Sequence, residues 1–118
     1  HIALAEELNM PVVLEEFGLD RDEGAFSPQS TTQYRDRFFQ FVFSKIEGSI
    51  ERGGPLAGSN FWAWGGFGKA MHEDAVWREG DKTFVGDPPQ EPQGLYAVFS
   101  SDTSTLKIVS KHAANIAQ

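Results

Sequence analysis

The sequence contains no cysteine, which excludes a disulfide framework, a thiolate metal site and a cysteine nucleophile. It has no apolar run approaching the ~20 residues needed to cross a bilayer, so we expect no membrane partner. Basic residues are few, because 10 Lys and Arg stand against 17 Asp and Glu, and the net charge is −7. This charge disfavours binding to nucleic acid or to anionic membrane surfaces, whereas a neutral polysaccharide fits it. The length of 118 residues is that of one domain.

One short stretch, Val12–Phe17, carries the first candidate site residues. Its apolar start is β-branched, and the stretch is bounded by proline and glycine, so we predict a short buried strand. Parallel sheets place their chemistry at the carboxyl ends of strands, which is where Glu15 and Glu16 stand. Side chains alternate along a strand, so these two carboxylates must point to opposite faces, and only one of them can face a crevice or barrel mouth.

Helical patterns flank this strand. Residues 1–9 have the pattern of the end of an amphipathic helix, with Asn9 at its C-terminus. After a polar loop over residues 18–29, Ser30 and Gln33 fit a capping box that opens a long helix, which ends at residues 53–55, Gly-Gly-Pro. Three- and four-residue spacing predicts that this helix turns the following residues toward the core: Tyr34, Phe38, Phe41, Val42, Lys45, Ile46, Ser49 and Ile50.

A second predicted strand, residues 58–64, is rich in aromatic side chains. Alternation places Phe61 and Ala63 on one face and Trp62 and Trp64 on the other, and two glycines at residues 65–66 end the strand. Two indoles at the carboxyl end of a strand fit a surface on which the flat C–H faces of sugar rings stack. On spacing alone, packing of both indoles in the core is an equal alternative.

The connection over residues 65–100 is too long for a routine loop and indicates a functional segment. The prolines within residues 87–94 predict an extended, semi-rigid stretch that is pinned to its own domain. A final helix begins at Ser101 or Asp102, and its apolar stripe is predicted at Leu106, Val109, Ala113 and Ile116.

We expect no metal site and no cofactor. His72 has no second nitrogen or thiolate ligand nearby in the sequence, so a surface or hydrogen-bonded role is expected for it. The loop residues Asp20, Asp22 and Glu23 offer fewer ligands than an EF-hand needs at fixed spacing, which favours a solvated acidic loop.

The order of elements amounts to two βα units. Parallel strands need neighbours on both edges and cover on both faces, and two strands cannot supply this. The pattern also begins inside a helix, because no N-cap precedes His1. We therefore predict an α/β fold in which residues 1–118 form the C-terminal quarter of a (β/α)8 TIM barrel. Such a segment is incomplete on its own, and its partner would be the missing N-terminal part of the barrel or another chain.

Three motifs, PVVLEEFG, GSNFWAWGG some forty residues later, and GDPPQEPQG, resemble the C-terminal end of family 5 glycoside hydrolases, and most of all the endo-1,4-β-mannanases. The resemblance runs through nearly all of the chain, and it implies that the two predicted strands are strands seven and eight of that barrel. It implies that Glu16, directly before the aromatic residue and the glycine, is the catalytic nucleophile. It also implies that Trp62 floors the subsite where the bond breaks, whereas Trp64 occupies a more variable aromatic position and is a weaker candidate for binding sugar.

The resemblance further implies retaining hydrolysis of β-mannan by a secreted or periplasmic enzyme. The general acid/base of the family is a glutamate that follows an asparagine at the end of strand four. This sequence contains no Asn-Glu pair, so we expect that carboxyl group outside the chain and expect the segment alone to be inactive. Glu15 is expected to support the strand or to form an ion pair.

Two alternatives stay open. The motifs around Glu16 and Trp62 are shared across family 5, so a β-glucanase or cellulase segment is the first, and only the proline-rich stretch favours mannan. The second is a non-catalytic carbohydrate-binding domain that uses Trp62, Trp64 and Trp77. Binding modules of this size are usually all-β, which the helical patterns disfavour.

Overall fold

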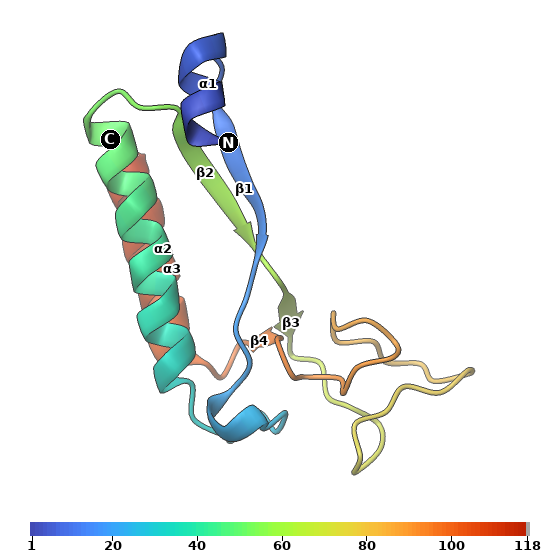
Figure 1. The fold of residues 1–118 in the computed structure, drawn as a ribbon. Coiled ribbons are helices and arrows are strands. Elements are labelled where there is room, and N and C mark those ends of the chain that lie inside the picture. The colour runs from blue at the N-terminus through green and yellow to red at the C-terminus, as the bar shows by residue number, and fades with distance from the viewer. Residues whose placement is uncertain (118) are drawn as a thin grey trace.

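The computed structural model describes residues 1–117, which form two βα units with parallel strands (Figure 1). Strand β1 pairs in parallel with β2, and α2 is the crossover between them, while β3 pairs in parallel with β4. Within these residues, no helix has both the length and the apolar character that a membrane span requires. The elements in chain order are α1 (Ile2–Leu8), β1 (Val12–Phe17), the 3-10 helix η1 (Asp22–Gly24), α2 (Gln33–Glu51), β2 (Leu56–Phe61), β3 (Trp64–Gly66), β4 (Val98–Phe99) and α3 (Thr103–Ile116).

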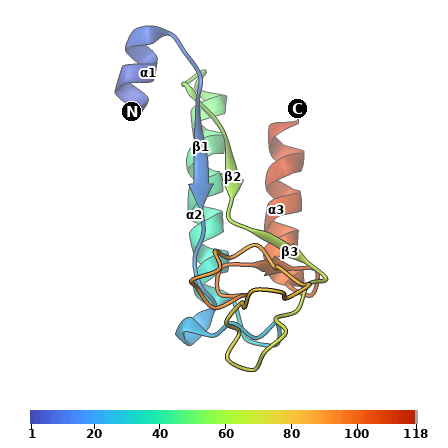
Figure 2. The same ribbon diagram turned by 90° about the vertical axis from the view of Figure 1, so that its right-hand side faces the viewer.

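The core lies between the strands and the helices α2 and α3, which lie side by side on one side of the strands (Figures 1 and 2). Phe17, at the end of β1, packs on Phe39 of α2 with ring centroids 4.9 Å apart. Phe43 stacks on the His112 ring of α3 at 4.0 Å, which joins the two helices. The buried cluster comprises Phe17, Phe39, Val42, Phe43, Ile46 and Val98.

Strand β1 has the predicted bounds, but the prediction that it is buried is wrong for this chain. Val13 is 50% exposed and Leu14 is 38% exposed. The reason is that β1 has only β2 as a neighbour within residues 1–117, so nothing there covers its other edge and one of its faces. Parallel strands are normally covered on both faces, so the exposure of these apolar side chains agrees with the prediction that the chain is part of a barrel.

The helix α2 is found where the spacing predicts it, but its buried face is rotated from the predicted one. Tyr34 and Phe41 are exposed, whereas Phe39 and Phe43 are buried. Aromatic residues stand at so many positions of the first three turns that the spacing fits either of two buried faces equally well. Contact with β2 and α3 decides which face is buried. The buried residues of α2 are Arg35, Phe39, Val42, Phe43, Ile46 and Ser49.

The start of α2 is capped differently from the prediction, because Ser30 and Gln33 form no capping box. The carboxylate of Asp22 instead accepts the backbone N–H groups of Gln33 at 2.9 Å and Tyr34 at 3.0 Å. It also accepts the hydroxyl of Thr31, and these hydrogen bonds lower the pKa of Asp22. The predicted acidic loop therefore supplies a helix cap from η1.

The N-cap of α3 is Asp102, one of the two predicted residues, without a side-chain capping hydrogen bond. The predicted apolar stripe of α3 is wrong at Ala113 and Ile116, which are exposed, because the face that meets α2 buries Thr105 and His112.

The predicted second strand is divided in two. β2 ends at Phe61, and β3 begins at Trp64 and includes Gly65 and Gly66, the two residues expected to end the strand. The connection expected to be irregular contains β4, which pairs with β3. A Cβ at Gly65 would lie 2.9 Å from the Phe99 ring and 3.0 Å from the Ala97 side chain, so the absence of a side chain lets β4 approach β3. A two-residue strand has no period that a sequence pattern could reveal.

Candidate active site

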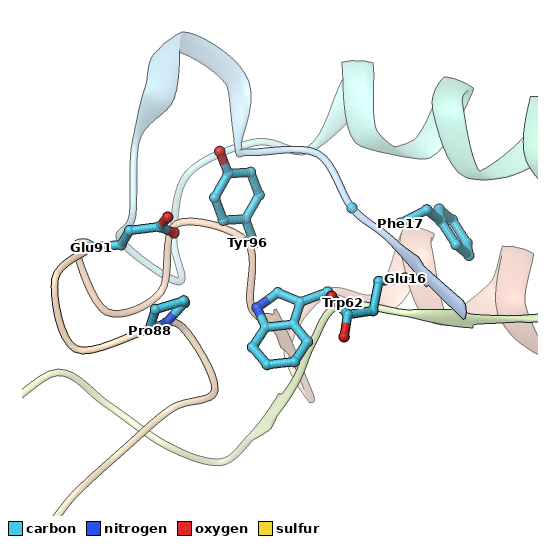
Figure 3. Close-up of a pocket in the computed structure, with 7 residues that line it drawn as sticks. Glu16, Phe17, Trp62, Pro88, Glu91 and Tyr96 are labelled. Carbon is cyan, nitrogen blue, oxygen red and sulfur yellow. The ribbon is translucent and has the colours of Figure 1, made fainter. Parts of the chain in front are cut away.

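A pocket of about 380 Å³ lies at the carboxyl ends of β1 and β2. One wall comes from these strand ends and the other from the long connection between β3 and β4 (Figure 3). In a parallel sheet this is the edge where catalytic side chains gather. The lining residues are Glu16, Phe17, Gly18, Trp62, Pro88, Glu91 and Tyr96.

The structure brings Glu16 and Trp62 together. The Glu16 side chain lies beside the Trp62 indole, while the Phe17 ring points away from it (Figure 3). Strand alternation explains this difference, because Phe17 is buried in the core and Glu16 on the preceding position is exposed. A carboxylate and a 37% exposed indole therefore share one pocket.

Trp62 is held against the end of β1 by backbone contacts. Its N–H donates to the carbonyl oxygen of Phe17 at 2.7 Å, and its peptide bond to Ala63 is cis. A Cβ at Gly18 would lie 2.6 Å from the Trp62 carbonyl oxygen, so only glycine permits this approach. The main chain of Trp62 is thus held close to the strand end that carries Glu16.

The opposite wall is a turn stabilised by two buried polar side chains. Asp87 is fully buried and accepts the N–H groups of Gly94 at 2.6 Å and Tyr96 at 2.9 Å. The side-chain amide of Gln93 donates to the carbonyl oxygens of Asp87 at 2.7 Å and Pro88 at 3.1 Å. Burial raises the pKa of Asp87, and the hydrogen bonds from the backbone N–H groups of Tyr96 and Gly94 oppose this rise. The proline-rich stretch is therefore pinned to its own domain, as predicted, but it forms turns at residues 89–90 and 93–94, so the predicted extended conformation is wrong.

Arg35, at the start of α2, connects both walls. Its guanidinium is fully buried and donates to the carbonyl oxygens of Leu19 at 2.8 Å, Leu95 at 3.0 Å and Ala97 at 2.9 Å. Leu19 follows the strand end that carries Glu16, and Leu95 and Ala97 flank Tyr96 of the opposite wall. Burial, together with the nearby charge of Arg21, lowers the pKa of Arg35 to about 10, so the group stays protonated at neutral pH.

Asp102 supplies the counter-charge for this region. It accepts two hydrogen bonds from Arg21, at 3.0 Å and 2.6 Å, and one from the backbone N–H of Phe99 at 2.8 Å. The Arg35 guanidinium lies 3.6 Å from the same carboxylate. Sequence reasoning missed both arginines. The available signal was that Arg35 stands four residues before Phe39, in phase with the buried face of α2.

The other sequence candidates lie elsewhere. Trp64 is 55% exposed and does not line the pocket, and Glu15 is exposed on the neighbouring position of β1. His72 makes a hydrogen bond with Asp81 at 3.0 Å, as expected for a histidine in a loop. Residues 1–117 contain no group of three or more histidine, aspartate or glutamate side chains placed to hold a metal ion. Glu91, Tyr96 and Pro88 were not expected in the site, because they approach it only through the folding of the long connection.

Residues 1–118 match the family described as GH family 5 beta-mannosidase-like. The chain belongs to this family. The sequence resemblance to family 5 glycoside hydrolases is therefore confirmed. Among curated relatives, mannan endo-1,4-beta-mannosidase 7 of Arabidopsis thaliana is 41% identical over 98% of this chain and 22% of its own length. Putative mannan endo-1,4-beta-mannosidase 4 of the same plant is 33% identical over 96% of this chain and 22% of its own length.

Solved structures show the same relationship. The family 5 mannosidase of Rhizomucor miehei superposes with a TM-score of 0.83 at 33% identity and covers 98% of this chain and 28% of its own. A variant of that enzyme in complex with mannosyl-fructose gives a TM-score of 0.82 at 33% identity, with the same coverage. The family 5 chain described here thus spans about a quarter of the length of the relatives that it matches. The prediction of a partial α/β barrel is confirmed.

Proposed function

We propose that this chain is the segment of a retaining endo-β-1,4-mannanase that supplies the nucleophile, Glu16, and a sugar-stacking platform, Trp62. The supporting observation is that this carboxylate and this indole line one pocket at the carboxyl ends of adjacent parallel strands. The names of the relatives support mannan as the substrate class. Trp64, which is exposed and does not line the pocket, remains a weaker candidate for a sugar contact.

The proposed reaction needs two carboxyl groups about 5–5.5 Å apart on either side of the glycosidic bond. Glu16 attacks the anomeric carbon and forms a glycosyl ester, while the second carboxyl gives its proton to the leaving oxygen. That second group, then a carboxylate, takes a proton from water, which attacks the ester and releases the sugar. Trp62 holds the C–H face of the ring by dispersion and apolar burial, which orients the anomeric carbon toward Glu16.

We propose that the remaining strands of the barrel supply the second carboxyl. The exposed Val13 and Leu14 on β1 mark the surface that those strands would cover. The segment alone therefore lacks the proton donor for the leaving group and is inactive. Because polymeric mannan does not cross membranes, we propose that the complete enzyme works outside the cell or in the periplasm.

The experiment measures reducing-sugar release from mannan and from carboxymethyl cellulose by a complete barrel that carries this segment. We expect turnover of mannan, no turnover by the segment alone, and a fall of about 10⁴-fold or more with Glu16→Ala, as when other enzymes lose a nucleophile. Glu15→Ala, on the opposite face of the same strand, is the matched control and should stay active. Activity retained in Glu16→Ala removes Glu16 from the role, and faster turnover of the cellulose derivative makes the enzyme a β-glucanase.

A further inference from the structure

A second carboxylate, Glu91, lines the pocket from the wall opposite β1. In Figure 3 the Glu91 and Glu16 side chains lie on opposite sides of the Trp62 indole. The two acids therefore flank one aromatic surface. We infer that Glu91 is a sugar-binding residue that accepts hydrogen bonds from the hydroxyl groups of the sugar unit next to the one held at Glu16. This inference rests on the proposed function.

The turn that carries Glu91 is held rigidly enough to present a carboxylate to a ligand. The backbone N–H of Glu91 donates to the carbonyl oxygen of Pro88 at 2.9 Å, and Pro92 follows it directly. The buried Gln93 amide and the buried Asp87 carboxylate fix the main chain on both sides. Preorganisation of this kind lowers the entropic cost of binding, because the residue need not be ordered by the sugar.

The chemistry of the pocket suits a neutral glycan. A carboxylate only accepts hydrogen bonds and has two oxygens, so it can take the protons of two neighbouring hydroxyl groups at the edge of a ring that stacks on an indole. Among the described residues no lysine or arginine lines the pocket, and both buried arginines are committed to carbonyl groups and Asp102. Two carboxylates without a cation disfavour sugars that carry their own carboxylate.

Glu91 is a different group from the missing acid/base. It lies in a turn between prolines, on the connection from β3 to β4, whereas the resemblance places the acid/base after an asparagine at the end of another strand. The role assigned to Glu91 is therefore binding and choice of substrate, with no proton transfer.

The test measures binding separately from hydrolysis. A complete barrel that carries this segment with Glu16→Ala is titrated with mannotetraose and cellotetraose by isothermal calorimetry. Adding Glu91→Ala should weaken binding of the tetraose that the parent binds by about 10- to 100-fold, the range expected for loss of hydrogen bonds to a charged group. Glu91→Gln keeps the size of the side chain and should give a smaller loss. Glu79→Gln, at an exposed glutamate of the same connection, is the control and should bind like the parent.

The outcomes separate this inference from the proposed function. Equal affinity in the parent and the Glu91→Gln and Glu91→Ala variants overturns the inference, as does a parent that binds neither tetraose. If Glu91→Ala fails to fold, as judged by thermal unfolding, Glu91→Gln decides alone. If the variants lose affinity but the barrel with Glu16 intact does not hydrolyse mannan, the role of Glu91 stands and the proposed mannanase activity fails.

Discussion

Replacing Asp102 with alanine should destabilise the protein more than any single surface change. Asp102 faces two guanidinium groups, those of Arg21 and Arg35, and the side chains of both arginines are fully buried. Removing the carboxylate leaves both cations without their shared counter-ion and leaves the Phe99 N–H without its acceptor. Breaking one partner of a buried ion pair costs about 3–5 kcal/mol. This is a large share of the roughly 5–15 kcal/mol that stabilises a typical domain.

The assay is equilibrium unfolding in urea of a complete barrel that carries this segment, followed by circular dichroism. The matched control is Asp74→Ala, because Asp74 also pairs with an arginine, Arg78, but both side chains are about half exposed. Solvent screens such a pair, so the control should unfold at the same midpoint as the parent. If Asp102→Ala and Asp74→Ala unfold at the same urea concentration, the buried network does not stabilise the fold and the reasoning is refuted.

Two further predictions test the packing of the site and of the helices. Gly18→Ala should displace Trp62, because the Trp62 carbonyl oxygen would lie 2.6 Å from the new Cβ. We expect the affinity for the tetraose, measured by calorimetry, to fall by about tenfold. Gly58→Ala is the control, because its new Cβ would meet no atom within 4 Å, and it should bind like the parent. Equal binding by both variants would contradict the tight approach. For Glu47, the hydrogen bond from His112 lowers the pKa, so its stabilising effect is present above pH 4.5 and is lost as the pH falls through the folded pKa. The difference between the urea midpoints of parent and Glu47→Gln should therefore be full at pH 5.5 and shrink as the pH is lowered below 4.5; a difference that does not shrink on acidification would show that the charge of Glu47 is not involved.

The sequence predicted those parts of the fold that depend on local patterns. The bounds of β1 follow from a β-branched run between proline and glycine, and α3 begins after Asp102, as predicted, although the Asp102 carboxylate binds Arg21 and the Phe99 N–H and does not cap the helix. Glu16 and Trp62 could be placed in one pocket because both stand at carboxyl ends of strands that a crossover helix makes parallel.

The missed features depend on residues far apart in the sequence. Asp22 caps α2 from eleven positions before Gln33, a spacing that no local motif describes. Arg35 lies in phase with the core, but its carbonyl partners become visible only when the long connection folds back over α2. The rotated face of α2 has the same origin, because contacts with distant elements selected between two phases that fit equally well.

The guanidinium of Arg35 has a consequence for how this enzyme family member can be altered. It holds main-chain oxygens on both sides of the pocket without lining the pocket itself, so the spacing of the two sides depends on a residue other than the lining side chains. Exchanging Glu91 or Tyr96 would change the side chains on one wall of the pocket and leave the Arg35 contacts that space the walls in place. Changing the size of residue 39, whose ring packs on the lining residue Phe17, would instead shift the wall that β1 forms. Directed evolution would therefore reach the chemistry of one wall through its own side chains, and the width of the pocket through residues of α2 that lie behind the walls.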